Sequence, residues 1–262
     1  MDWESHFYQR SEPRFLIQNQ LCMSSKPESF QFSKVFEIGS FQVNPDGKLR
    51  WKDLADLFQE VAWRHADSAD FGRILQEANQ MWVLSRFEIK CEDLPSWGDQ
   101  VEIFTAGRGV EGLFAFREFL MLGDKGKTLA AGMSSWLLLD SQSKKIIGPE
   151  KALPDHLFKI NSKPAWIPER HRLKSLEKSA IGVKVRASDL DLQNHVNNTS
   201  YIKWVEDFMQ EEGLKIESLS INYLAECFLG DQVEFFIKRL DSELQILGQV
   251  GEKKVFSAVV KI

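Results

Sequence analysis

Residues 97–104 read WGDQVEIF and residues 229–236 read LGDQVEFF, so the run GDQVE occurs twice in the chain. Each copy lies at the same place in an expected series of one strand, one helix and four further strands. Five identical residues in a matched context indicate a duplicated unit. We therefore expect two units of the same fold, at residues 31–143 and 179–262.

The expected elements follow from hydrophobic periodicity between turn signals. Strands alternate apolar and polar residues, whereas the two helices carry apolar residues at three- and four-residue spacing. The turn NPDG at residues 44–47 closes the first strand. In the first unit we expect strands at 34–43, 81–90, 100–108, 113–122 and 128–140, and a helix at 51–69. In the second unit we expect strands at 180–187, 216–223, 232–240, 244–250 and 254–262, and a helix at 198–212.

Two segments lack such periodicity. Residues 144–178 hold four of the eight prolines, which predicts a linker that lies over the surface with short helical turns at most. Residues 1–30 precede the first patterned strand, and we expect a disordered or extended segment there. Each unit has one helix to cover its sheet, so we expect an α+β fold in which an antiparallel sheet wraps around each long helix and the two sheets pair side by side. This is the arrangement of two tandem hot-dog domains.

The composition limits the classes of function. The net charge of −5 does not indicate a nucleic-acid partner or an anionic membrane surface, and no apolar run approaches the roughly 20 residues that span a bilayer. Cys22, Cys91 and Cys227 lie far apart without metal-ligand spacing, so we expect no metal, no cofactor and no disulfide framework. Residues 1–30 lack a secretory-signal pattern and are acidic for a transit peptide, which favours a cytoplasmic, bacterial protein.

The most polar segment is residues 186–198, RASDLDLQNHVNN, which joins a strand to the second helix. Two carboxylates, two amides and an imidazole precede the helix, with Asn197 or Asn198 as the N-cap. Free N–H groups and the macrodipole at a helix N-terminus favour negative charge. A thioester carbonyl placed there would be polarised, and the oxyanion formed on it would be stabilised. Ordinary capping residues and a solvated histidine would explain the same residues without a function.

This segment resembles the active-site segment of plant and bacterial acyl-acyl-carrier-protein thioesterases, which reads here DLDLxxHVNN from Asp189 to Asn198, followed by Tyr201 and Trp204. The similarity covers nearly all of the chain from about Phe32. It includes WVL at 82–84, PSWGD at 95–99, SSW at 134–136 and NYLAEC at 222–227. Many matched motifs in the same order make the resemblance specific, since a histidine motif alone recurs among other hot-dog proteins.

The resemblance implies five site residues. In this family the motif is usually Asp-x-Asn-x-His, with a Glu, often followed by Cys, on the next strand. Carried over, these positions are Asp191, Gln193, His195, Glu226 and Cys227. Gln193 departs from the family's Asn and moves the amide outward by one methylene, and Asn194 could supply the amide only by turning the opposite way. Preorganised donors are sensitive to shifts near 1 Å, so reduced or altered activity is compatible with this departure.

The implied reaction is hydrolysis of a fatty acyl thioester on an acyl carrier protein to free fatty acid and carrier. Glu226 or Asp191 would act as general base toward a water. His195 would hydrogen-bond that water or protonate the leaving thiolate, while Gln193 and the helix N–H groups would hold the carbonyl. Attack by Cys227 paired with His195 is the competing mechanism. We favour water, because on a strand Cys227 would point away from Glu226.

The first unit has no histidine in its equivalent stretch, residues 43–51, so we expect it to be catalytically empty. The resemblance implies that this unit holds the acyl chain. His65 lies on the apolar stripe of the first helix, where we expect a structural role. Acyl carrier proteins are acidic, so a basic surface should receive the substrate. The linker is a candidate docking surface, or merely a solvated segment, because it carries Lys159, Lys163, Arg170, His171, Arg172, Lys174 and Lys178.

Two other functions stay open on the sequence. An acyl-CoA thioesterase would use the same acyl chain and thioester on another carrier, and a non-catalytic acyl-chain-binding module is compatible with Gln193. A hydratase is disfavoured, because its Asp/His pair on the central helix is not seen. The duplication already supplies the two units that single hot-dog chains obtain by dimerising, and a homodimer of the whole chain is compatible with it.

Overall fold

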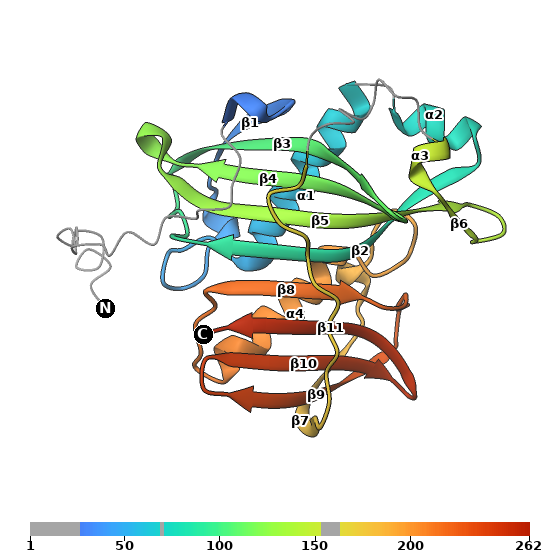
Figure 1. Ribbon diagram of the computed structural model, residues 1–262. Coiled ribbons are helices and arrows are strands. Elements are labelled where there is room, and N and C mark those ends of the chain that lie inside the picture. The colour runs from blue at the N-terminus through green and yellow to red at the C-terminus, as the bar shows by residue number, and fades with distance from the viewer. Residues whose placement is uncertain (1–26, 69–70, 153–162) are drawn as a thin grey trace.

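The computed structural model describes residues 27–68, 71–152 and 163–262. The described strands form one large antiparallel sheet, and the long helices α1 (Trp51–Ser68) and α4 (Asn198–Glu211) lie on the same face of it (Figure 1). The strand order is β1-β3-β4-β5-β2-β8-β11-β10-β9-β7, and β6 pairs with β5. The strands of the first unit therefore fill one half of the sheet and those of the second unit the other half. The expected α+β fold with two hot-dog sheets side by side is confirmed.

The strands of the first unit are β1 (Phe32–Glu37), β2 (Gln80–Cys91), β3 (Gln100–Glu111), β4 (Phe114–Leu122) and β5 (Thr128–Asp140), and β6 (Ile146–Ile147) lies in the expected linker. Those of the second unit are β7 (Glu177–Lys184), β8 (Ser218–Tyr223), β9 (Gln232–Leu240), β10 (Glu243–Val250) and β11 (Lys253–Lys261). The short helices are α2 (Phe71–Glu77) and α3 (Pro149–Ala152). We did not expect α2 or β6. The first strand also ends earlier than expected, because a 3-10 turn at Ser40–Gln42 leads into the approach to α1.

In the first unit, α1 packs on the sheet through Phe58. Its ring stacks on Phe119 of β4 with centroids 5.0 Å apart and tilts against Phe87 of β2 at 6.4 Å. Gly132 of β5 lies beneath this cluster, and a Cβ there would come within 3.1 Å of both Phe58 and Phe87. Glycine at this position therefore lets the helix approach the sheet closely.

In the second unit, α4 packs in the same way. Tyr201 meets Phe256 of β11 edge-on at 5.6 Å, and Phe208 meets Phe235 of β9 at 5.9 Å. Gly248 of β10 leaves the space that the Phe256 ring occupies, since a Cβ at that position would overlap it. Each unit thus wraps its sheet around its own helix, and a single hydrophobic core runs through both units.

The two units are joined through the sheet and through a helix cap. β2 pairs with β8 from Arg86 opposite Asn222 to Lys90 opposite Ser218, which makes the sheet continuous. Glu206 is buried on α4 and accepts hydrogen bonds from the backbone N–H groups of Trp51 at 3.0 Å and Lys52 at 3.1 Å. The first turn of α1 is therefore capped by a carboxylate of the other unit.

The connection between the units crosses the sheet face opposite the helices (Figure 1). Arg86 Nη1 donates to the carbonyl of Pro168 at 3.0 Å, and Lys90 Nζ lies 4.3 Å from the centroid of the Trp166 ring. Residues 153–162 of the expected linker lie outside the described residues. Within the described residues, no helix combines the length and apolar character that crossing a bilayer requires.

The expected N-terminal extension lies outside the described residues up to position 26. Residues 27–30, which we assigned to that disordered or extended segment, instead lie on the first half of the sheet. Arg108 of β3 donates from Nη1 to the carbonyl of Ser29 at 2.9 Å, and its guanidinium lies 4.7 Å from the centroid of the Phe30 ring.

Candidate active site

The polar segment before α4 forms a tight loop around Asp191. The N–H of Asp191 donates to the carbonyl of His195 at 2.8 Å. In return Asp191 Oδ1 accepts from the N–H groups of Gln193 at 2.8 Å and of His195 at 3.1 Å. Asn194 turns the chain at a φ of 61°, in the left-handed region that Asn tolerates better than most residues. The carboxylate of Asp191 therefore holds the loop that presents His195.

Glu226 and Cys227 lie in the loop between β8 and β9, and our placement of them on a strand is wrong. The consecutive N–H groups of Leu224 and Ala225 both donate to the carbonyl of Val255, at 2.9 and 3.2 Å. This doubled contact interrupts the ladder between β8 and β11. The chain leaves the sheet before it reaches Glu226, which is exposed, and then buries Cys227.

The two loops bring His195 next to Glu226. The N–H of Val196 donates to the carbonyl of Cys227 at 3.1 Å, which fastens one loop to the other. His195 Nδ1 then lies 3.6 Å from Glu226 Oε1, with 30% and 56% of the two side chains exposed. The separation exceeds that of a direct hydrogen bond and is within ion-pair distance for a protonated His195. Phe228 meets the imidazole edge-on at 5.4 Å and limits its rotation.

Cys227 is fully buried and separated from this exposed pair. Desolvation raises the pKa of the Cys227 thiol, and a hydrogen bond from the Tyr201 hydroxyl offsets only part of that effect. The nucleophilic form of cysteine is the thiolate, so these surroundings favour the unreactive thiol. Geometry and charge state both separate Cys227 from the chemistry available at His195.

The N-terminus of α4 completes the group. Asn197 is the N-cap, since its Oδ1 accepts from the N–H of Thr199 at 3.2 Å and its carbonyl accepts from the N–H of Ser200 at 2.9 Å. The N–H of Asn198 has no acceptor among the described residues, which leaves one backbone donor of the first turn available. Tyr223 fixes this position by donating from its hydroxyl to the Asn198 carbonyl at 3.0 Å.

The remaining polar residues of the segment differ in their roles. Asp189 is buried and structural: Oδ2 accepts from the N–H of Arg186 at 2.9 Å, and Oδ1 lies 3.1 Å from Lys203 Nζ. The Gln193 side chain is exposed and makes no hydrogen bond within the described part of the chain. The structure thus brings Asp191, His195 and Glu226 together and leaves the amide of Gln193 free.

Two family models match the two halves of the chain. The model of the acyl-ACP thioesterase N-terminal domain matches residues 29–155, and that of the acyl-ACP thioesterase C-terminal domain matches residues 173–255. The chain belongs to the acyl-ACP thioesterase family. Among relatives of this family, the chain is 28% identical over 242 residues to oleoyl-acyl carrier protein thioesterase 1, chloroplastic, of Arabidopsis thaliana, covering 83% of this chain and 67% of the plant protein.

Solved structures of family members show the same fold. An acyl-ACP thioesterase from Bacteroides thetaiotaomicron superposes with a TM-score of 0.77 at 25% identity, covering 87% of this chain and 96% of that one. The 12:0-ACP thioesterase from Umbellularia californica superposes with a TM-score of 0.72 at 24% identity, covering 88% and 96%. The curated plant relatives are longer, and the chain spans 52% to 67% of their length.

In this thioesterase-family chain, the first unit repeats the backbone hydrogen bonds of the His195 loop, but different side chains stand at the equivalent positions. The N–H of Asn44 donates to the carbonyl of Lys48 at 2.8 Å, as Asp191 does to His195. The N–H of Leu49 donates to the carbonyl of Pro95 at 2.8 Å, as Val196 does to Cys227. Lys48 therefore occupies the position of His195, and Leu94, which precedes Pro95, occupies that of Glu226.

Three residues around the candidate site were not predicted from the sequence to take part in it. Tyr201 contacts Cys227, Tyr223 holds the first residue of α4, and Lys253 Nζ donates to the carbonyl of Glu226 at 2.9 Å. The two tyrosines stand inside the motifs that carried the resemblance, which was the only signal for them. Nothing in the sequence marks Lys253, because its contact joins the start of β11 to a loop 27 residues earlier.

Proposed function

We propose that the chain hydrolyses the thioester between a fatty acyl chain and an acyl carrier protein, releasing free fatty acid and carrier. The observation that supports this is the pairing of His195 with Glu226, 3.6 Å apart, beside the available N–H of Asn198. A carboxylate, an imidazole and a helix N-terminus supply a base, a proton carrier and an oxyanion donor. The names of the family's relatives indicate the substrate class.

In the proposed reaction Glu226 takes a proton from a water whose oxygen bonds to the thioester carbon. The carbonyl oxygen becomes an oxyanion, which the N–H of Asn198 and the positive end of the α4 dipole stabilise. When the intermediate collapses, the carbon–sulfur bond breaks and the sulfur leaves with its electron pair. The proton that Glu226 accepted passes through His195 to that sulfur, which gives the thiol of the carrier and the fatty acid.

Asp191, Gln193 and Cys227 have distinct proposed roles. Asp191 is a positioning residue, because its Oδ1 is already occupied by two N–H groups of its own loop. The exposed amide of Gln193 reaches the substrate carbonyl as a second donor. Cys227 packs beneath the loop and does not attack the thioester, since burial raises the pKa of its thiol and favours the unreactive form.

We assign the acyl chain to the first unit, residues 31–143, and the catalytic groups to the second, residues 179–262, with residues 144–178 as the linker. Support comes from the first unit's Lys48 and Leu94, which offer neither a carboxylate nor an imidazole. His65 keeps its structural role: its Nδ1 lies 3.1 Å from Arg117 Nη1, and burial and Arg117 lower the pKa of His65 to about 4. A cytoplasmic location and a homodimer remain predictions.

Release of free fatty acid from a panel of acyl-carrier-protein thioesters tests the proposed function. The Glu226→Ala and His195→Ala variants should each lose at least about 100-fold in kcat/KM, equivalent to about 2.7 kcal/mol of transition-state stabilisation. Lys48→Ala is the matched control, because it truncates the equivalent position of the first unit. That variant should keep kcat/KM within about twofold of wild type.

Acyl-CoA and acyl-pantetheine with the same chains complete the panel. Equal kcat/KM on acyl-CoA and on the acyl carrier protein would show that the carrier is not recognised. Binding of acyl chains without turnover by wild type would overturn the proposed activity and direct attention to Gln193.

A further inference from the structure

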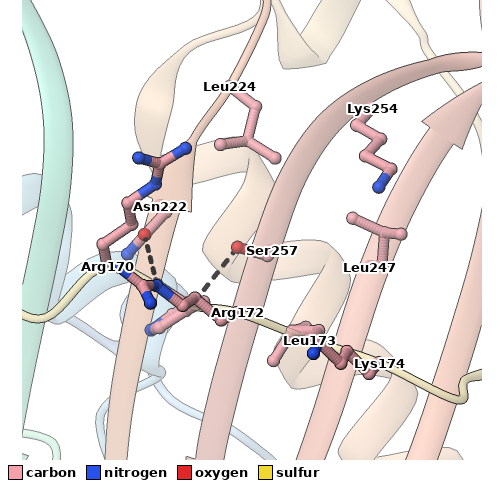
Figure 2. Close-up of a pocket in the computed structure, with 10 residues that line it drawn as sticks. Arg170, Arg172, Leu173, Lys174, Asn222, Leu224, Leu247, Lys254 and Ser257 are labelled. Carbon is pink, nitrogen blue, oxygen red and sulfur yellow. Dashed lines mark hydrogen bonds between the residues drawn. The ribbon is translucent and has the colours of Figure 1, made fainter.

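A groove lies on the sheet face opposite the helices, where the connection between the units crosses the second unit (Figure 2). Its volume is about 670 Å³. One wall is the connection, and the floor is formed by β8, β11 and β10 through Asn222, Ser257 and Leu247. Arg170, Arg172, Lys174 and Lys254 line its rim, and no carboxylate lines it among the described residues.

The connection is held on the sheet by His171. Its backbone N–H donates to Asn222 Oδ1 at 2.9 Å, its Nδ1 lies 3.1 Å from Ser257 Oγ, and its Nε2 lies 3.0 Å from Ser220 Oγ. Burial lowers the pKa of His171, so the ring is a neutral anchor rather than one of the positive charges. The groove is therefore a built feature, whose wall is fixed by three side chains of the sheet.

The four cations of the rim, which we call the groove cations, are all exposed. None of them forms an ion pair with a carboxylate among the described residues, whereas Lys48, Arg50 and Lys52 of the first unit each do. Arg86 of β2 adds a fifth positive charge close to Arg170. The carboxylates of Glu169 and Glu243, which lie near His171, are fewer than these five cations. The remaining like charges repel each other, and an anionic partner would relieve that repulsion.

The groove is next to the catalytic loops. Leu224 lines the groove and is 50% exposed, and Glu226 follows two residues later, a span of at most about 7 Å. On the neighbouring strand Lys254 lines the groove, while Lys253 holds the carbonyl of Glu226. A partner seated in the groove would thus lie beside the residues proposed to cleave the thioester.

We infer that this groove is where the acidic surface of the acyl carrier protein docks, with the groove cations contacting its carboxylates and the phosphodiester of its prosthetic arm. This inference rests on the proposed function and names the surface that delivers its substrate. Charge complementarity of this kind raises the association rate and selects the partner. The fatty acyl chain itself, bound elsewhere, carries no charge for the groove to recognise.

A charge-reversal comparison tests the groove. The doubly substituted variant Arg170→Glu with Arg172→Glu is matched by Lys125→Glu with Lys215→Glu, two exposed lysines outside the groove that have no ion pair among the described residues. Both variants change the net charge by −4. Two measurements are made on each: binding of fluorescently labelled carrier protein by anisotropy at low and high salt, and kcat and KM on acyl carrier protein and on acyl-pantetheine.

The groove variant should bind carrier protein at least tenfold more weakly at low salt, and raise KM on the acyl carrier protein by a similar factor, with kcat unchanged. Hydrolysis of acyl-pantetheine should be unaffected, because that substrate lacks the acidic protein. The difference should shrink at high salt, which screens exposed charges. The Lys125/Lys215 variant should stay within about threefold of wild type, a margin expected for rim charges away from the contact.

Equal binding by the groove variant and its matched control would overturn the docking site, while wild-type turnover would leave the proposed function standing. If wild type does not hydrolyse any acyl carrier protein, the proposed function fails, and the binding measurement still decides the groove. Absence of carrier-protein binding by wild type would overturn the docking site directly.

Discussion

The loop that presents His195 in the second unit and the loop around Lys48 in the first unit have the same backbone frame and opposite chemistry. In both loops the key residue lies three positions before the long helix. Its carbonyl accepts a hydrogen bond at 2.8 Å from the N–H of the residue four positions earlier in the chain. The key residue is His195 in one unit and Lys48 in the other. Lys48 Nζ donates to the carbonyl of Leu94 at 2.8 Å and to Asp93 Oδ1 at 3.3 Å, and these contacts join the two loops at the surface.

The helix N-termini differ as much as the side chains do. The N–H of Asn198 begins α4 without an acceptor among the described residues, whereas the equivalent N–H of Trp51 donates to Glu206. The N–H of Asn198 in the second unit is thus available to a substrate, whereas the N–H of Trp51 in the first unit binds Glu206 and links the two units. The two loops therefore share a backbone frame but differ in whether the first N–H of the helix is left without an acceptor within the described residues.

The largest expected effect is the loss of activity in His195→Ala, which moving the pair into the first unit should not restore. In a His195→Ala background, Lys48→His with Leu94→Glu should leave kcat/KM at least about 100-fold below wild type, because the donor at Trp51 stays occupied by Glu206. Fatty-acid release is compared with His195→Ala alone. A recovery of more than tenfold over that background would show that the two side chains suffice without the helix N-terminus.

Removing the cap between the units should destabilise the fold. Glu206→Ala leaves the buried N–H of Trp51 without its acceptor, and we expect the free energy of unfolding to fall by about 2 kcal/mol. Urea denaturation at neutral pH measures the change. Glu211→Ala, at the exposed end of the same helix, should stay within about 0.5 kcal/mol of wild type. Equal losses in the two variants would mean that the cap does not hold the units together.

Replacing one cysteine in each unit should change kcat/KM only slightly. Cys227→Ser keeps a hydrogen-bonding partner for Tyr201, and kcat/KM should stay within about fivefold of wild type if water is the nucleophile. Cys91→Ser is the control in the first unit. A loss near 100-fold for Cys227→Ser alone, with normal unfolding behaviour, would favour attack by the thiol over attack by water.

The smallest effect is on how stability depends on pH. Burial raises the pKa of Glu206 above its ordinary value of 4.5, so the folded protein holds this proton to higher pH than the unfolded chain. The contribution of this group is therefore most favourable below 4.5 and declines as pH rises through the folded pKa. Relative to Glu206→Gln, which lacks this titration, wild type should lose stability as the pH rises above about 4.5. A wild-type advantage that grows with pH in urea denaturation would contradict the assignment.

Much of the frame could be predicted from the sequence, because it depends on local patterns. The repeated GDQVE runs place β3 and β9, and the hydrophobic spacing predicts the helix at 198–212 within one residue of α4. The motif around His195 was found through its resemblance to a family rather than through chemistry, and the same resemblance selected Glu226. The placement of Glu226 and Cys227 on a strand failed, because β8 ends at Tyr223 and the N–H groups of Leu224 and Ala225 both donate to the carbonyl of Val255.

By itself, the sequence determined the duplication and the alternation of helix and strands, since turn residues and apolar periods act over a few positions. Only the tertiary structure decided which helix N-terminus is open, because Glu206 reaches Trp51 across 155 residues. It also decided where the positive charge gathers. Arg170 and Lys254 line one groove because the connection crosses the sheet there, and that contact has no local signature.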